Sequence, residues 1–319
     1  MEYPKFKVCV RCFTFNQAKY IEDAMNGFAM QQTDFPFVCC IVDDASTDGE
    51  QDVIKKYMDM HFDYSPNSVS FEKETDYAYI HYAQHKENKN CYFAVVFLKM
   101  NLYSKKEGFK KFEYISEWRD ISEYEAICEG DDYWIAPNKL QKQVDYMEAH
   151  PMCSLSFHAH QELTKDCFVL VRRYNQLVEE CPMADIILGD GGFMATNSMV
   201  YRTDKILKNE PNWAKNAPVG DLPLMLKMAT QGTVAYIDEI MSVYRINTPG
   251  SWTARSMTFR YKYNFIKRKN IMWKGYDEWT NYKYHKEVFK MRRDNWIDLF
   301  KFPFAYLKRM FYGLFDKWE

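Results

Sequence analysis

The 319-residue chain contains little glycine and proline, with 12 and 11 residues respectively. This scarcity excludes a collagen-like repeat and a linker rich in these two residues. The sequence also has no run of 18 consecutive apolar residues, so no membrane-spanning helix is expected. Its N-terminus lacks the charged start, apolar stretch and cleavage site of a secretory signal peptide. These absences predict a folded, cytoplasmic protein.

A disulfide framework is also missing. The nine cysteines are an odd number without regular spacing, and most lie inside apolar runs such as Phe37–Val42. Buried, reduced thiols in a reducing compartment are therefore expected. Cys9-x-x-Cys12 has the spacing of a redox or zinc pair, but it lies within a strand pattern and no second pair follows at metal spacing. We therefore reject a metal or redox role for it.

The N-terminal half alternates between strand and helix patterns. An apolar strand at Phe6–Phe13 is broken by Thr14–Gln17, where Asn16 is expected to cap the following helix. That helix, Ala18–Met30, has one apolar stripe, and Phe35–Val42 is typical of a strand buried on both faces. A polar turn and a second helix, around 51–60, come next. This order predicts an α/β fold with a parallel sheet.

Further elements are predicted along the chain, although residues 61–112 give no clear order beyond a short strand at Ala94–Leu98. Helices are expected at Ile115–Ser122, Asn138–Ala149 and Ala217–Gln231, and strands at Tyr124–Cys128, Met152–His158, Met194–Tyr201, Val234–Ile237 and Ile240–Tyr244.

Polar side chains follow three of the predicted strands. They are Asn16, the pair Asp43 and Asp44, and the pair Asp131 and Asp132. Ligands of open parallel sheets bind beyond the carboxyl ends of the strands, so these clusters are expected to form one site. Mg²⁺ or Mn²⁺ that bridges a diphosphate needs only one or two protein carboxylates. The alternative is that Asp131-Asp132 is simply a polar turn.

Four motifs in order resemble the family 2 glycosyltransferases of GT-A fold, most closely the bacterial enzymes that build capsular and other surface polysaccharides. They are Thr14-Phe-Asn16, Ile41-Val-Asp-Asp-Ala-Ser-Thr-Asp48, Glu129-Gly-Asp-Asp-Tyr-Trp134 and Gly220-Asp221. The resemblance covers about residues 5–250. It implies a GT-A-type nucleotide-binding fold, with a mainly parallel central sheet flanked by helices. Residues 1–135 would bind the nucleotide-sugar, 136–250 would form the acceptor side, and 251–319 would be a helical C-terminal extension.

The resemblance also implies roles for single residues. Thr14, Asn16, Asp43, Asp44 and Asp131 would bind the nucleotide, Asp132 would hold Mg²⁺ or Mn²⁺, Asp221 would be the general base, and Thr196, Asn197 and Ser198 would line the acceptor pocket. The chain departs from the family at Phe13, where relatives commonly have proline, and at Ala45, where they commonly have glycine.

These roles imply an inverting, metal-dependent transfer of a sugar from a nucleotide diphosphate, expected to be UDP, to a glycan or lipid-linked glycan. A nucleotidyltransferase is the alternative enzyme, although Thr14–Ala18 lacks the glycine-rich, basic phosphate loop that it would need. A catalytically inactive glycan-binding or scaffold protein of the same fold is the alternative outside enzymes. Asp221 alone could also be a helix cap, and Arg245 could bind phosphate or form an ion pair.

Charge is distributed unevenly. Residues 1–254 carry 26 Lys and Arg against 37 Asp and Glu, whereas residues 255–319 carry 16 against 7. From Met291 onward, aromatic residues and leucine alternate with lysine and arginine, which is typical of a helix at a membrane interface. We therefore expect peripheral contact of 291–319 with the anionic inner face of the cell membrane. A helix packed on the body and a dimer contact are the alternatives. No nucleic-acid-binding module is recognised.

Overall fold

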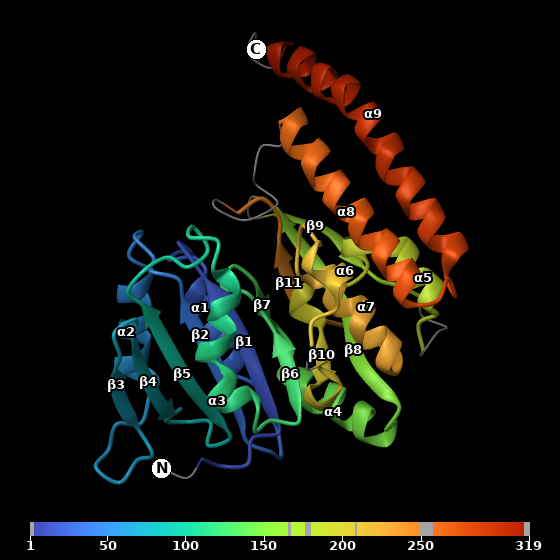
Figure 1. Ribbon diagram of the computed structural model, residues 1–319. Helices are drawn as coiled ribbons and strands as arrows, with labels where there is room; N and C mark the ends of the chain where they lie inside the picture. Colours follow the sequence, from blue (N-terminus) through green and yellow to red (C-terminus); the bar gives the residue numbers. More distant parts are fainter. Residues whose placement is uncertain (1–2, 165–166, 176–179, 208, 249–257, 316–319) are drawn as a thin grey trace. The chain divides into compact units, whose positions relative to one another are not determined.

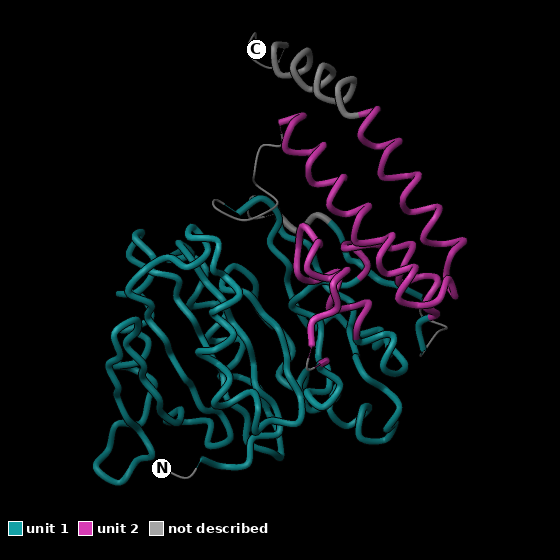
Figure 2. Tube along the Cα trace, in the orientation of Figure 1, with its two compact units in different colours: residues 1–181, 194–206, 228–255 teal, residues 182–193, 207–227, 256–319 magenta. Residues whose placement is uncertain are grey.

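The structure, a computed structural model, describes residues 3–164, 167–175, 180–207, 209–248 and 258–315, with the side chains of 167–169 and 302–315 left out. The chain divides into two compact units (Figure 2). Unit 1 comprises residues 1–181, 194–206 and 228–255, and unit 2 comprises 182–193, 207–227 and 256–319. The predicted division after residue 250 lies outside the described residues.

Unit 1 is built on one 11-stranded sheet, in the order β3-β4-β5-β2-β1-β6-β10-β8-β11-β7, with β9 paired to β8 (Figure 1). The strands are β1 (Val8–Thr14), β2 (Phe37–Asp43), β3 (Phe71–Glu74), β4 (Ala78–Gln84), β5 (Cys91–Leu98), β6 (Tyr124–Ile127), β7 (Tyr133–Trp134), β8 (Cys153–Thr164), β9 (Cys167–Arg172), β10 (Val200–Arg202) and β11 (Thr233–Arg245). Its centre, β5-β2-β1-β6, is parallel, and β8 and β11 also pair in parallel. The predicted α/β class and mainly parallel central sheet are confirmed.

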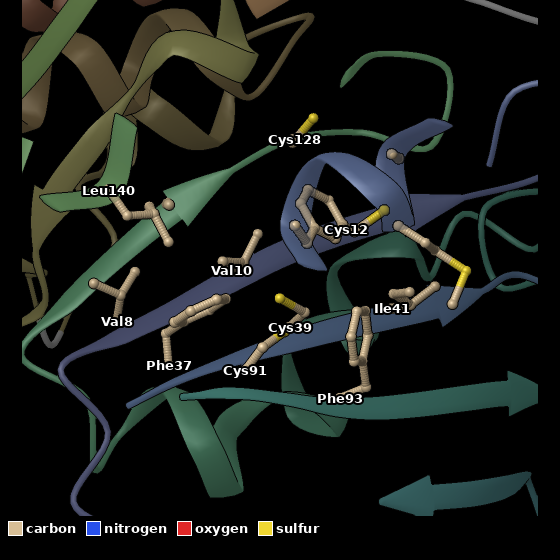
Figure 3. Packing of buried hydrophobic residues seen from close by; sticks show 14 of the residues in the cluster. Val8, Val10, Cys12, Phe37, Cys39, Ile41, Cys91, Phe93, Cys128 and Leu140 are labelled. Atoms are coloured by element: carbon tan, nitrogen blue, oxygen red, sulfur yellow. The ribbon is translucent and has the colours of Figure 1, made fainter. Parts of the chain in front are cut away.

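The helices of unit 1 are short. They are α1 (Ile21–Ala29), α2 (Glu50–His61), α3 (Ser116–Arg119) and α4 (Lys139–Ala149), with a 3₁₀ helix at Gly108–Tyr114. Alternate residues of the central strands face two separate cores. Val10, Cys39 and Phe93 pack with α1, α2 and α4 (Figure 3), whereas Cys9 and Cys40 pack with α3. This arrangement explains why β2 is apolar from Phe37 to Val42, because neither face of the strand meets water.

Several predicted elements differ from the structure. Residues 61–112 contain three strands, of which β3 and β4 form an antiparallel pair at the sheet edge. Most of the predicted strand Met194–Tyr201 is not a strand: it contains a 3₁₀ turn, Thr196–Ser198, and β10 begins only at Val200. The two strands predicted between 234 and 244 are one strand, β11, whose pairing with β8 shifts register between Ile237 and Ile240.

Unit 2 is helical. It contains α5 (Met183–Gly189), α6 (Asn212–Lys215), the start of α7 (Asp221–Gln231), α8 (Phe259–Trp279) and α9 (His285–Phe315), with a 3₁₀ turn at Asp190–Gly192. Helix α8 packs against both α6 and α9. The expected helical C-terminal region is therefore present, and α9 continues through residue 303. Among the described residues, no helix combines the length and the apolar character needed to cross a membrane.

Candidate active site

Two loops meet the end of β1 at the carboxyl edge of the parallel sheet. The N–H of Asp44, after β2, donates to the carbonyl of Thr14 at 3.0 Å, and the N–H of Gly130, after β6, donates to the carbonyl of Phe13 at 3.3 Å. Gly130 has no space for a side chain, because a Cβ atom there would lie 2.1 Å from Thr14 Oγ1. Three of the four predicted motifs therefore converge at one edge of unit 1.

Glu50 connects these loops, and the sequence analysis did not identify it. The residue is fully buried in the first turn of α2. One carboxylate oxygen accepts a hydrogen bond from Thr14 Oγ1, and the other accepts from the N–H of Gln17 and from Ser46 Oγ, both at 2.8 Å. Burial raises the pKa of Glu50, and these three donors partly offset that rise. An acidic residue in the first turn of a helix was the only sequence signal, and it is equally typical of a favourable helix-dipole contact.

Asn16 belongs to the same turn and does not cap α1, so that expectation is wrong. The helix begins at Ile21, and the cap position is occupied by Tyr20 without a side-chain hydrogen bond. Asn16 has a left-handed backbone with φ of 56°, and its Oδ1 accepts from the N–H of Thr47 at 2.8 Å. Asparagine is one of the few residues that adopt this conformation readily.

Asp43 and Asp44 lie side by side but have different partners. Asp43 accepts from Gln51 Nε2 at 2.5 Å, and burial raises its pKa. Asp44 is fully buried and accepts from the N–H groups of Leu102 at 2.6 Å and Tyr103 at 3.1 Å. Lys111 approaches the same carboxylate at 3.4 Å. The carboxylate of Asp44 therefore holds the segment that follows β5 against the site.

Asp131 and Asp132 are held by the end of β11. Asp132 Oδ1 accepts from the backbone N–H of Arg245 at 2.8 Å, and Asp131 Oδ2 accepts from Thr248 Oγ1 at 2.7 Å. Burial raises the pKa of Asp131, and burial and then the neighbouring Asp131 charge raise the pKa of Asp132 well above its usual range. Ionisation of both carboxyl groups at once is therefore unfavourable in the protein alone.

Arg245 is ion-paired, which the sequence left open. Its guanidinium donates to the carbonyl of Asp131 at 2.8 Å and pairs with Asp23 on α1. The group lies 4.8 Å from the ring centre of Tyr20 and 4.4 Å from that of Tyr133. This clamp fixes the acidic turn to α1.

The predicted acceptor residues lie beneath the acidic turn. Asn197 is fully buried: its carbonyl accepts from Trp134 Nε1 at 2.8 Å and its Nδ2 donates to the carbonyl of Val243 at 2.8 Å. Ser198 is also buried and donates to the carbonyl of Ala195 at 2.7 Å. Thr196 is half-buried at the start of the same turn. In this structure Asn197 supports β7, and acceptor binding by all three residues stays a prediction.

Asp221 is the first residue of α7 and belongs to unit 2. Its Oδ1 accepts from the N–H of Leu222 at 3.0 Å. Burial raises the pKa of Asp221, as does the negative charge of Asp190, while Lys269 lowers it. A carboxyl group of this kind can accept a proton, so the helix-start position and a role as general base are compatible.

The carboxylate oxygens of Asp131 and Asp132 fit a hard divalent cation. No group of three or more His, Cys, Asp or Glu side chains in the described part of the chain could hold a metal ion alone. A cation that also binds a diphosphate needs only one or two protein carboxylates, and Asp132 with Asp131 supplies them. Histidine is another common metal ligand, but His158 lies in the core: it is buried, and its Nδ1 is bonded to the carbonyl of Ala159.

Comparisons with known proteins show a family signature near the N-terminus and a similar fold. Residues 10–78 match the model of glycosyl transferase family 2. The fold is similar to that of Staphylococcus aureus TarS residues 1–349, solved in complex with UDP, with a TM-score of 0.53 and 16% identity over 85% of this chain and 65% of that one. A second TarS structure gives a TM-score of 0.53 and 17% identity, over 84% of this chain and 39% of that one. Residues 10–78 therefore carry the sequence signature of glycosyl transferase family 2, and the fold is of the GT-A type, as the motifs predict.

Among curated proteins, the chain is similar to uncharacterised proteins from Mycobacterium bovis and Mycobacterium tuberculosis. Each is 31% identical over 239 residues, which cover 75% of this chain. The chain spans 58% of the length of these relatives.

Ala45 tests the backbone geometry of the turn after β2. Its φ is 59°, in the left-handed region that disfavours residues with a Cβ atom. Replacing Ala45 with glycine should raise the free energy of unfolding by about 1 kcal/mol in denaturant titrations. Ala229→Gly, within α7, is the control and should lower it by about as much. A loss of stability in Ala45→Gly would contradict the strained turn.

Proposed function

We propose that the protein is an inverting, metal-dependent glycosyltransferase that moves a sugar from a nucleotide diphosphate, UDP in particular, to a glycan or lipid-linked glycan in surface polysaccharide synthesis. The observation that carries this proposal is the convergence of Thr14, Asp44 and the acidic turn at one edge of the sheet. This is the edge at which open α/β sheets bind their ligands. The UDP in the TarS structure of similar fold supports a uridine nucleotide.

The residues of unit 1 would bind the donor. Thr14, Asn16, Asp43 and Asp44 would contact the nucleotide, and Asp131 would lie nearer the ribose. Asp132 would hold Mg²⁺ or Mn²⁺, which, when bound, supplies Lewis-acid stabilisation of the negative charge on the leaving diphosphate. The unfavourable joint ionisation of Asp131 and Asp132 supports such a role, because a cation would remove their mutual repulsion.

Asp221 would act as the general base. The oxygen of an acceptor hydroxyl attacks the anomeric carbon as the bond from that carbon to the diphosphate breaks, and the bonding electron pair leaves with the diphosphate. Asp221 takes the hydroxyl proton as the new carbon–oxygen bond forms. Attack opposite to the leaving group inverts the anomeric configuration, so no protein nucleophile is required. Thr196, Asn197 and Ser198 would belong to the acceptor side.

The described part of α9 supports peripheral membrane contact. Val288, Met291 and Leu299 are buried, whereas the opposite stripe is exposed. Its members are the apolar residues Phe289, Trp296, Ile297 and Phe300 and the basic residues Lys286, Lys290, Arg293 and Lys301. Aromatic and cationic side chains on one face are typical of helices that lie on anionic lipid. The side chains of 302–319 lie outside the described residues. The protein would thus act at the inner face of the cell membrane.

Asp132→Asn tests the metal site. The amide keeps the size of the side chain but removes the charge that would hold the cation, so Mn²⁺-dependent binding of UDP should be lost in isothermal titration. Asp34→Asn, at a surface turn outside the site, is the control and should bind as the unmodified protein does. Retained Mn²⁺-dependent binding in Asp132→Asn would remove this residue from the site. If the unmodified protein shows no Mn²⁺-dependent UDP binding, an inactive scaffold is the better description.

Asp221→Asn separates chemistry from donor binding. Loss of the general base should lower sugar transfer at least about 10²-fold, because proton removal contributes 10²–10⁴-fold in general. The affinity for UDP with Mn²⁺ should not change. Transfer is measured as UDP release from a panel of UDP-sugars. A collapse of UDP affinity, or normal transfer, would show that Asp221 has a different role.

The exposed stripe of α9 predicts lipid binding. Replacing Phe289, Trp296 and Phe300 together with serine should lower affinity for phosphatidylglycerol-containing vesicles at least about tenfold. The reason is that serine removes the exposed apolar surface that the lipid would bury on binding. Serine at Tyr77, Tyr103 and Phe109, which are exposed aromatic residues of unit 1, is the matched control. Sedimentation with vesicles measures both. Equal binding to pure phosphatidylcholine vesicles, or an unaffected triple variant, would contradict the membrane role of α9.

A further inference from the structure

A buried lysine contacts the strand that follows the acidic turn Asp131-Asp132. Lys139 is the first residue of α4, and it is fully buried. Its Nζ donates to Gln143 Oε1 at 2.8 Å and lies 4.1 Å from the ring centre of Trp134. None of the proposed catalytic steps uses this amine.

The fold alone does not favour a lysine at position 139. Burial lowers the pKa of the Lys139 amine to about 7, and no carboxylate in the described part of the chain pairs with it. A cation in the first turn of a helix also meets the positive end of the helix dipole. The lysine is therefore unfavourable in two respects, and the groups that it contacts have to explain its presence.

Gln143 extends the contact of Lys139 to the predicted acceptor residues. It is fully buried one helical turn after Lys139, and its Nε2 donates to the carbonyl of Ser198 at 3.0 Å and to Ser156 Oγ at 3.1 Å. A carbonyl can only accept, so the amide nitrogen must face Ser198 and the amide oxygen must face Lys139. The lysine amine supplies the donor that this oxygen needs in the core.

These contacts close a ring. Trp134 Nε1 donates to the carbonyl of Asn197 at 2.8 Å, across 63 residues of sequence, and Asn197 directly precedes Ser198. The ring therefore runs through Trp134, Lys139, Gln143, Ser198 and Asn197. All five residues belong to unit 1, so the ring lies within one compact body. The acidic turn and the turn that contains Asn197 thus share one buried frame.

We propose that Lys139 and Gln143 are positioning residues that fix the acidic turn and the turn Thr196–Ser198 relative to each other. This inference rests on the proposed function, in which Asp132 holds the cation and Thr196–Ser198 belongs to the acceptor side. The amine of Lys139 holds the face of the Trp134 ring, and the carbonyl of the Thr196–Ser198 turn holds its N–H edge. Asp132, two residues before this ring, is thereby oriented before a cation binds.

Lys139→Met tests the link to the metal site. Methionine keeps an unbranched side chain of similar length and removes the amine. Mn²⁺-dependent binding of UDP should weaken about tenfold in isothermal titration, as is typical when a residue that orients a metal ligand is lost. Binding of UDP without metal should not change. Lys142→Met, on the same helix but in an ion pair at the surface, is the matched control and should bind as the unmodified protein does.

Gln143→Met tests the ring from its other side. It removes the amide, so it should weaken Mn²⁺-dependent UDP binding in the same way as Lys139→Met. In protein labelled with ¹⁵N-tryptophan, the indole N–H signal of Trp134 is assigned by its loss in Trp134→Phe. This signal should shift in the metal-free Gln143→Met protein, because the amide acts on the ring through Lys139 and through Ser198. Lys142→Met should leave the signal in place.

The inference and the proposed function fail in different ways. Retained Mn²⁺-dependent binding in Asp132→Asn would contradict the metal site, and the inference with it. Loss of this binding in Asp132→Asn but not in Lys139→Met and Gln143→Met would overturn the inference alone and leave a structural lysine, whether or not thermal stability falls. Equal weakening of UDP binding with and without Mn²⁺ would also overturn it. Gln143→Met gives an answer even if Lys139→Met does not fold.

Discussion

The close approach of Gly130 to Thr14 is the constraint on which the rest of the site depends. A side chain at 130 would occupy the position of the Thr14 hydroxyl, so only glycine allows the acidic turn to lie against the end of β1. The parallel pairing of β1 with both β2 and β6 then brings Asp44 to the same edge. Motifs more than a hundred residues apart in the chain meet there because parallel strands end on the same side.

Buried and half-buried acidic groups gather at this edge. Glu50, Asp43, Glu129, Asp131 and Asp132 all have pKa values raised first by burial. The arginines near this edge also pair with other carboxylates, so they balance its charge only in part. Arg11 pairs with Glu125 as well as Glu129, and Arg245 pairs with Asp23. Such an excess of buried negative charge is unfavourable for folding alone. It is understandable in a site that receives a divalent cation, which is why the proposed metal and the electrostatics of unit 1 agree.

The chain uses backbone contacts to support its site. Asp132 accepts from the N–H of Arg245, and Trp134 donates to the carbonyl of Asn197. Asp44 accepts from the N–H of Leu102, in the segment after β5. Side chains that resemble ligand contacts in sequence therefore have structural partners in the folded protein. In unit 2, Asp221 likewise has a backbone partner, because its Oδ1 accepts from the N–H of Leu222.

The sequence by itself determined the central strands, because β1, β2 and β6 are buried on both faces and their apolar runs need no partner to be recognised. It also located the polar residues at their ends, since a strand followed by a carboxylate pair is a local pattern. Only the tertiary structure decided the partners of Glu50, Asn197 and Lys269, which are Thr14, Val243 and Asp190. Their hydrogen bonds and ion pairs join residues 36, 46 and 79 positions apart. Local sequence contains no signal for such pairings, because they depend on strand order, register and helix packing.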